Sequence, residues 1–230
     1  MKNYTSINDI DNIATWIKEA KEIKANPLAN IELGKNKTLG LLFFNSSLRT
    51  RLSTQKAALN LGMNPIVMNV SDDAWGIEFG DGTIMNGNTA EHIKEAAAVV
   101  SQYCDIIAVR AFPTLSDKQK DESEHILNSF LKYASVPIIN MESATQHPLQ
   151  GLTDAITISE NTNKKKPKIV LSWAPHIKAL PHAVGNSFAE AMQKMDVDFV
   201  IANPEGYDLN PEITKDTPIF HNQLVHIVFF

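Results

Sequence analysis

The sequence predicts an α/β protein with two doubly wound parallel-sheet domains, the second of them incomplete. Three observations lead to this fold class. Short apolar runs recur, and most are apolar throughout, as expected for strands covered on both faces. Helix-patterned segments separate these runs, and such alternation is typical of right-handed βαβ units. A polar run, ENTNKKK at 160–166 followed by Pro167, indicates a surface turn close to the change of domain.

Six apolar runs are predicted strands, and a seventh near the C-terminus is a further candidate. The six cover residues 39–44, 65–70, 105–110, 136–141, 168–173 and 197–202, and the candidate covers 224–230. The intervening patterns predict helices at 7–24, 50–62, 90–103, 118–133, 150–160 and 182–195. We place the domain change at the 150–160 helix, which gives domains at 1–149 and 150–230.

The C-terminal sequence LVHIVFF is an apolar run without a closing helix or polar tail. A bare apolar strand at the end of a domain leaves an edge that is prone to aggregation. We therefore expect a truncated or frame-disrupted C-terminus. The alternative is a final strand that is tucked into the sheet.

Composition excludes several classes of protein. A formal net charge of -5 argues against nucleic-acid binding, which requires a basic face. No apolar run approaches the ~20 residues of a membrane span, and the N-terminus lacks a signal-peptide pattern. Cys104 is the single cysteine, which precludes an internal disulfide and fits a reducing compartment. We expect a cytoplasmic protein without nucleic-acid or membrane partners, with Cys104 in its core.

The segment FFNSSLRTR at 43–51 carries the strongest local signal. An apolar strand ends there, Ser46 or Ser47 can cap the following helix, and the free N–H groups of its first turn form a natural anion site. Arg49 and Arg51 lie in that turn, where the helix dipole disfavours cations, so a bound anion is indicated. The alternative is a solvated basic helix start. Neither a Walker loop nor a Rossmann glycine fingerprint is present.

The residues SLRTR at 47–51 resemble the S-x-R-T-R signature of the aspartate and ornithine transcarbamylases. In that family this loop and helix start bind the phosphate of carbamoyl phosphate. The resemblance implies that Ser47, Leu48, Arg49 and Thr50 bind this ligand.

The residues HPLQ at 147–150 are similar to the H-P-x-Q motif of the same family. The resemblance implies that His147 donates to the carbamoyl oxygen, where charge develops during attack, and that Gln150 holds the carbamoyl NH₂. Arg110 ends the 105–110 strand, at the sheet edge where open α/β sheets bind ligands. A family arginine there reaches the same ligand, whereas the alternative is a solvent-facing side chain. The expected catalytic residues are His147, Arg49 and Arg110.

Further residues resemble the N-acylornithine branch of the family, over about residues 1–220. They are NSSLRTRLSTQKAALNLGMN at 45–64, NMESAT at 140–145, WAPH at 173–176 and NS at 186–187. The resemblance implies that Glu142 and His176 contact the acylated amino acid. It also implies that Trp75 enters a neighbouring subunit's carbamoyl-phosphate site, and therefore a homotrimer with shared active sites. The alternative for Trp75 is a lid over the protein's own core.

The chemistry of this branch needs no cofactor. Acylation leaves the side-chain amine of ornithine as the nucleophile, and the departing phosphate can accept its proton. No metal is expected, because His147 and His176 lack ligand-like spacing.

The loop at 87–92 bears on the acyl group. Succinyl-type members have Pro at the position that matches Ala90, and acetyl-type members carry Glu on this loop. Ala90 departs from both, but it leaves space and adds no negative charge. N-succinylornithine is therefore favoured over N-acetylornithine as the acceptor.

Family members also carry an H-C-L-P motif followed by arginine, and a lysine for the acyl chain, which have no match here. We therefore expect little or no activity from this chain. Two alternatives to the enzyme stay open: a remnant that only binds carbamoyl phosphate, and a trimerising subunit. The retained Arg49, Arg110, His147 and Gln150 argue against the second. A dinucleotide-binding protein is disfavoured because the glycine fingerprint is absent.

Overall fold

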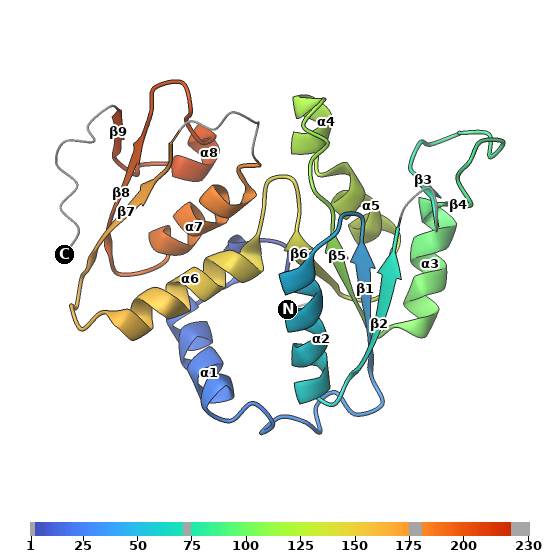
Figure 1. Cartoon of the computed structure of the whole chain (residues 1–230), viewed down its shortest axis with the longest axis horizontal. Coiled ribbons are helices and arrows are strands. Elements are labelled where there is room, and N and C mark those ends of the chain that lie inside the picture. The colour runs from blue at the N-terminus through green and yellow to red at the C-terminus, as the bar shows by residue number, and fades with distance from the viewer. Residues whose placement is uncertain (1–2, 71–74, 175–180, 222–230) are drawn as a thin grey trace.

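The computed structural model describes residues 3–70, 75–174 and 181–221. It contains a four-stranded sheet of order β2-β1-β5-β6 and a three-stranded sheet of order β7-β8-β9 (Figure 1). Neighbouring strands in both sheets are parallel. The predicted α/β class with parallel sheets is confirmed.

Six strands, β1, β2, β5, β6, β7 and β8, lie within two residues of the six predicted runs. The first sheet consists of β1 (Thr38–Phe43), β2 (Asn64–Asn69), β5 (Ile106–Arg110) and β6 (Ile138–Glu142), and the second of β7 (Lys168–Ser172), β8 (Asp198–Asn203) and β9 (Ile219–His221). A separate pair consists of β3 (Ile77–Glu78) and β4 (Glu91–His92). The strands β3, β4 and β9 are too short to stand out as apolar runs. The candidate strand at 224–230 lies outside the described residues.

Apart from the short α8, which was not predicted, the helices match the predicted segments, with two corrections. They are the 3₁₀ helix η1 (Ile7–Asp9), α1 (Ile13–Ala25), α2 (Leu48–Asn60), α3 (Ile93–Tyr103), α4 (Lys118–Glu122), α5 (His125–Tyr133), α6 (Pro148–Asn161), α7 (Ala183–Gln193) and α8 (Pro211–Thr214). Within the described residues, no helix has both the length and the apolar character needed to cross a membrane.

The first correction concerns the helix predicted at 7–24, which is interrupted after η1. Asp9 and Ser6 form a capping box around η1, and Asn12 caps α1 by accepting a hydrogen bond from the Thr15 N–H at 3.1 Å. Local side-chain hydrogen bonds of this kind compete with a continuous helix. The apolar periodicity therefore runs across a break that the polar residues create.

The second correction concerns the helix predicted at 118–133, which divides into α4 and α5. Glu124 separates them in the left-handed region, with a φ of 51°. A non-glycine residue adopts this conformation rarely, because its Cβ crowds the following carbonyl. The break therefore needs compensating contacts, and those of Glu124 are made with another loop.

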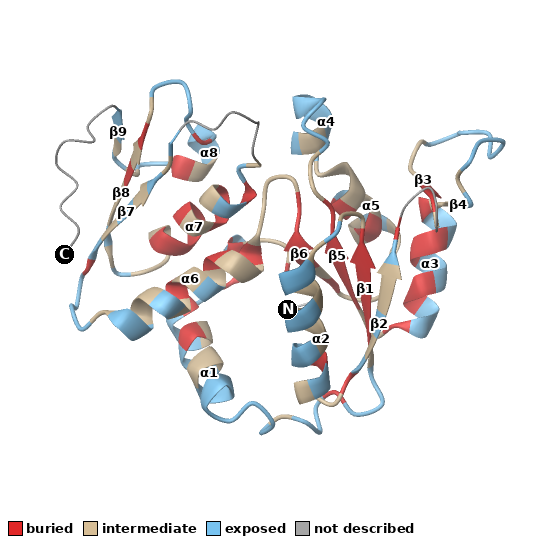
Figure 2. Cartoon of the chain, in the orientation of Figure 1, coloured by how far each residue is buried: buried red, intermediate tan, exposed pale blue. Residues whose placement is uncertain are grey.

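Helices cover both faces of the first sheet (Figure 2). On one face α3 and α5 pack on the strands through a buried cluster that includes Ile93, Phe130 and Ile107. On the other face α2 packs through Ala58 against Leu41 and its neighbours. Cys104 is buried in the first cluster, as predicted.

A third apolar cluster joins the two sheets. It contains Ile13 of α1, Ala155 of α6 and Met192 of α7, together with residues of β7 and β8. The N-terminal segment also pairs with the first sheet, because Tyr4 N–H donates to the carbonyl oxygen of Ile138 at 2.9 Å. This pairing covers the outer edge of β6, so that strand is not left open to solvent.

Candidate anion and carbamoyl site

The loop after β1 leads directly into a capped helix. Ser47 is the N-cap of α2, and its Oγ accepts a hydrogen bond from the Thr50 N–H at 3.3 Å. Leu48, the first residue of the helix, is 73% exposed, and Arg49 is exposed beside it. The first turn therefore presents N–H groups and the positive end of the helix dipole to solvent, with no acidic side chain nearby in the turn.

The two arginines of this turn differ in their contacts. The Nη2 of Arg51 donates to Asn69 Oδ1 at 2.6 Å, and its guanidinium lies 4.4 Å from the centre of the Phe43 ring. Arg51 therefore fastens α2 to the sheet. Arg49 makes no side-chain hydrogen bond or ion pair with any residue that the structure describes. Of the two, Arg49 is the one available to a ligand.

Arg110 lies at the carboxyl end of β5 with only 6% of its side chain exposed. Its Nη1 donates to the carbonyl oxygens of Asn45 at 3.3 Å and Ser46 at 3.1 Å. Its Nη2 donates to Glu142 Oε2 at 2.9 Å. Arg110, at the end of β5, thus holds the loop before α2. Glu142, at the end of β6, in turn holds Arg110.

His147 completes the cluster at the start of α6. Its Nε2 lies 3.5 Å from Glu142 Oε2, and its backbone N–H donates to Ser187 Oγ at 2.8 Å. Burial, and after it the charge of Arg110, lowers the pKa of His147 to about 4. Burial raises the pKa of Glu142, although Arg110 opposes that shift. At neutral pH His147 is therefore a neutral imidazole, which carries one N–H donor and one acceptor, rather than an ion-pair partner of Glu142.

Two buried nitrogen atoms of the cluster lack a hydrogen-bond partner among the described residues. They are Arg110 Nε and His147 Nδ1. Buried polar atoms are nearly always paired, so an unpaired atom calls for an explanation. At the carboxyl edge of a parallel sheet, hydrogen bonding to a ligand is one explanation.

Gln150 lies in the first turn of α6, and its Nε2 donates to Asp154 Oδ1 at 2.8 Å. This bond orients the amide so that Oε1 is left to accept from a ligand. Two residues with contacts around the site, Asp154 and Glu124, were not predicted from the sequence, and Ser187 was noted only as part of the branch resemblance, without a role. Their partners in the fold do not follow from any local motif.

Trp75 and Ala90 are not part of this cluster. Trp75 is half-buried against the core, and its Nε1 donates to Glu91 Oε2 at 3.2 Å. Ala90 is exposed, and its N–H donates to the carbonyl oxygen of Gly76 at 2.9 Å. Both lie around β3 and β4 beside α3, whereas β6 is at the opposite edge of the first sheet (Figure 1). His176 lies outside the described residues.

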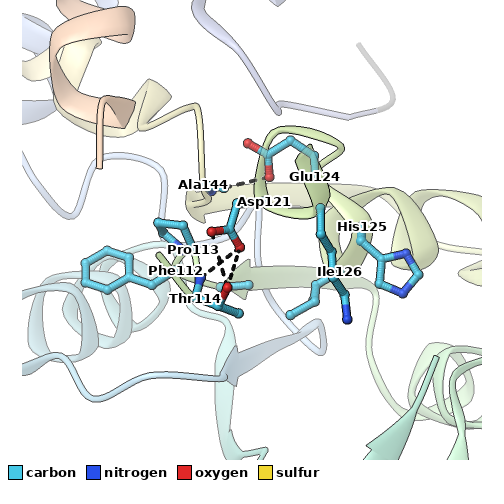
Figure 3. A pocket seen from close by; sticks show the side chains of 10 residues that line it. Phe112, Pro113, Thr114, Asp121, Glu124, His125, Ile126 and Ala144 are labelled. Atoms are coloured by element: carbon cyan, nitrogen blue, oxygen red, sulfur yellow. Dashed lines mark hydrogen bonds between the residues drawn. The ribbon is translucent and has the colours of Figure 1, made fainter. Parts of the chain in front are cut away.

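A small cavity of about 60 Å³ lies between the segment after β5, residues of α4 and α5, and the loop after β6 (Figure 3). Its lining includes Phe112, Asp121, Glu124 and Ala144. Ligand pockets are usually at least about 300 Å³, so this cavity is too small to be the substrate site. Within the described residues, no three His, Cys, Asp or Glu side chains gather in a way that could hold a metal ion.

The site therefore combines a helix N-terminus with a buried arginine at the carboxyl edge of a parallel sheet. Both features are typical of α/β proteins that bind anionic ligands. Residues 2–160 match the family model described as the carbamoyl-P binding domain of aspartate/ornithine carbamoyltransferase. The chain belongs to the aspartate/ornithine carbamoyltransferase family.

Individual relatives agree with this family. The chain is 49% identical over 224 residues to an N-succinylornithine carbamoyltransferase of Bacteroides thetaiotaomicron, covering 97% of this chain and 70% of the relative. It is 42% identical over 191 residues to an N-acetylornithine carbamoyltransferase of Xanthomonas campestris pv. campestris, covering 82% of this chain and 56% of the relative.

A solved structure of an N-acetyl-L-ornithine transcarbamylase variant has a similar fold. The TM-score is 0.86 at 35% identity, and the match covers 96% of this chain and 71% of the other. In that variant alanine replaces one glutamate, and the protein is complexed with carbamyl phosphate and N-succinyl-L-norvaline. The chain thus spans between 56% and 71% of the length of these three proteins.

Proposed function

We propose that the protein transfers the carbamoyl group of carbamoyl phosphate to the side-chain amine of an N-acylated ornithine. The reaction yields N-acylcitrulline and phosphate, as a step of arginine biosynthesis in the cytoplasm. The observation that carries the proposal is the buried cluster of Arg110, Glu142 and His147 beside the N-terminus of α2. Membership of the carbamoyltransferase family supports the same reaction.

The phosphate group is bound at the start of α2. The exposed first turn offers the N–H groups of Leu48, Arg49 and Thr50, and the Ser47 hydroxyl lies at its end. Arg49 adds a guanidinium with no other partner among the described residues, and Arg110 adds its unpaired Nε–H. Charge-assisted hydrogen bonds from arginine to phosphate are among the stronger ones in proteins.

The carbamoyl group lies near His147 and Gln150. Attack of the amine on the carbamoyl carbon places negative charge on the carbamoyl oxygen, and an N–H donor aimed there stabilises the transition state. Neutral His147 is such a donor, and Gln150 Oε1 accepts from the carbamoyl NH₂. As the new C–N bond forms, the C–O bond to phosphate breaks, and the departing phosphate takes the proton of the amine.

The acceptor is held by Glu142 and His176, and N-succinyl-L-ornithine is the preferred one. Ala90 is exposed and uncharged, so it leaves room for a succinate carboxylate. The structural relative in which alanine replaces a glutamate is complexed with N-succinyl-L-norvaline, which supports the idea that a small residue permits a succinyl group. The relative of 49% identity is named as an N-succinylornithine carbamoyltransferase, which also supports a succinyl acceptor.

Trp75 acts from a neighbouring subunit of a homotrimer. Within one chain it lies beside β3 and β4, apart from the cluster at β5 and β6 (Figure 1). From there it reaches the carbamoyl-phosphate site of the next subunit, so the active sites are shared.

The direct test measures product and phosphate from carbamoyl phosphate with N-succinyl-L-ornithine, N-acetyl-L-ornithine and L-ornithine in parallel. We expect ureido product with the acylated amines, fastest with the succinyl compound, and little with L-ornithine. The rate should be low, because the sequence has no match to the H-C-L-P motif. Calorimetric binding of carbamoyl phosphate without product would overturn the transfer reaction and leave a binding protein.

Two variants of the same helical turn test the phosphate site. Arg49→Gln should weaken carbamoyl-phosphate binding by about tenfold or more, equal to about 1.4 kcal/mol, because it removes a free guanidinium. Arg51→Gln is the matched control: it removes the same charge from a side chain already bonded to Asn69, so it should affect binding less. Equal losses in both variants would contradict a specific role for Arg49.

A further inference from the structure

One carboxylate holds the backbone that leads from β6 to His147. Glu124 Oε1 accepts hydrogen bonds from Ser143 Oγ at 2.8 Å, from the Thr145 N–H at 2.6 Å and from Thr145 Oγ1 at 2.6 Å. Its Oε2 accepts from the Ala144 N–H at 3.3 Å, a contact that is visible in Figure 3. A single side chain therefore contacts three successive residues of this loop.

The conformation of Glu124 favours this contact and is unfavourable for the start of its own helix, α5. Glu124 occupies the N-cap position of α5, yet its side chain makes no capping hydrogen bond. Its φ of 51° is unfavourable for a residue with a Cβ. Both features are explained if the conformation of Glu124 is determined by its contacts with the loop at 143–145. Capping of α5 does not explain them.

The opposite side of the same loop is held by α7. The Asn186 Nδ2 donates to the carbonyl oxygen of Thr145 at 3.0 Å, and Ser187 Oγ accepts from the His147 N–H at 2.8 Å. The loop is therefore fixed from the α5 side by Glu124 and from the α7 side by these two residues. With both ends in place, the imidazole of His147 lies 3.5 Å from Glu142.

We propose that Glu124 is a positioning residue for carbamoyl transfer: its carboxylate holds residues 143–145 so that His147 is aimed at the reacting group. This inference rests on the proposed function. Glu124 has no hydrogen bond or ion pair with Arg110, Glu142 or His147 themselves, so it acts through the backbone. Small displacements of a positioned group cost catalysis far more than they cost binding.

The test compares Glu124→Gln with Asp121→Asn. The amide of glutamine keeps the shape of the side chain but replaces one accepting oxygen with an NH₂ that faces backbone donors. Asp121 is a matched carboxylate one turn earlier, which accepts from the N–H groups of Thr114 and Leu115, each at 2.8 Å, and so holds a different loop. Both variants remove one negative charge from the same segment.

The readouts are the rate with N-succinyl-L-ornithine, the Kd of carbamoyl phosphate and the imidazole NMR signal of His147. We expect Glu124→Gln to lower kcat by about tenfold or more while Kd changes less than about threefold. The chemical shift and titration midpoint of His147 should move in this variant and stay unchanged in Asp121→Asn. Thr145→Val, which removes one of the four hydrogen bonds, should move them in the same direction by a smaller amount.

An unchanged His147 signal in folded Glu124→Gln would overturn the proposal, whatever happens to kcat. If Glu124→Gln does not fold, an unchanged signal in Thr145→Val overturns it instead. If the parent protein shows no turnover, the proposed function fails, but the NMR comparison still decides whether Glu124 positions His147.

Discussion

Both Nη atoms of the Arg110 guanidinium donate hydrogen bonds to other groups of the protein. Its Nη groups bind the Asn45 and Ser46 carbonyl oxygens and Glu142, and Phe112 lies against its face at 4.1 Å. Removing a guanidinium and a carboxylate from water is costly unless they pair with good geometry. The Glu142 contact at 2.9 Å supplies that pairing. Together with burial, the charge of Arg110 disfavours protonation of His147.

The first prediction concerns His147, whose pKa is lowered to about 4 by burial and by Arg110. Histidine in an unfolded chain titrates near about 6.5, so between these values the unfolded state binds the additional proton. The free energy of unfolding contributed by this group therefore falls as pH falls through that window, by at most about 3 kcal/mol. An NMR titration should place the midpoint of His147 well below that of an exposed histidine.

The His147→Gln variant assigns the signal and serves as the control for stability. Its free energy of unfolding should approach that of the parent as pH falls from 7 to 5, because only the parent loses the histidine contribution. A midpoint near the ordinary histidine value would show that the imidazole is open to solvent and not in the buried cluster.

At the scale of elements, α2 depends on its first turn. Ser47 Oγ accepts from the Thr50 N–H, one of the N–H groups that have no partner within the helix. Ser47→Ala should lower the free energy of unfolding by about 1 kcal/mol and should also weaken carbamoyl-phosphate binding.

Ser53→Ala is the matched control on the same helix. Ser53 is exposed, and its Oγ donates to the carbonyl oxygen of Thr50 at 3.3 Å, so among the described residues it pairs with none of the free N–H groups of the first turn. It should leave both stability and binding nearly unchanged. Equal losses in the two serine variants, in a urea titration and in calorimetry, would contradict the capping role.

Much of the fold could be predicted because its signals are local. Continuous apolar runs mark strands that are covered on both faces, and a serine before a helical pattern marks the start of α2. The breaks after η1 and at Glu124 were not predicted, because the apolar periodicity continues across them. In both cases side-chain hydrogen bonds overrule the pattern.

The candidate site could be predicted only in part for a related reason. Ser47, Arg110 and His147 each belong to a short motif or end a strand, so a single window of sequence identifies them. Glu124 and Ser187 act on residues 21 and 40 positions away along the chain, a relationship that only the fold creates. Asp154 is one turn from Gln150, but its contact has no distinctive pattern.

At the scale of the whole molecule, polar contacts beside the site join α7 to η1 and to the loop between β6 and α6. Buried Glu190 on α7 accepts from Asn8 Nδ2 at 2.8 Å and from Gln146 Nε2 at 3.2 Å. Gln146 Oε1 in turn accepts from Ser187 Oγ at 3.0 Å. The position of α7 is thereby coupled to the loop that carries His147. Any change in the packing of α6 against α7 should reach the site.

The last prediction concerns Gly151, where the backbone of α6 lies close to that of α7. A Cβ at this position would lie 2.6 Å from the carbonyl oxygen of Ser187 and 3.0 Å from Ile7 Cγ1. The oxygen belongs to the backbone of α7, so the helix itself must move to relieve the clash. We expect Gly151→Ala to lower the free energy of unfolding by about 1–3 kcal/mol, the usual cost of overpacking.

Because Ser187 Oγ also accepts from the His147 N–H, the same change should shift the His147 NMR signal. Gly185→Ala on α7 is the matched control. Its Cβ would meet Leu209 at an ordinary contact distance of 3.5 Å, and alanine should favour the helix by up to about 1 kcal/mol. A Gly151→Ala protein that keeps both parental stability and the parental His147 signal would show that α7 does not control the site through this contact.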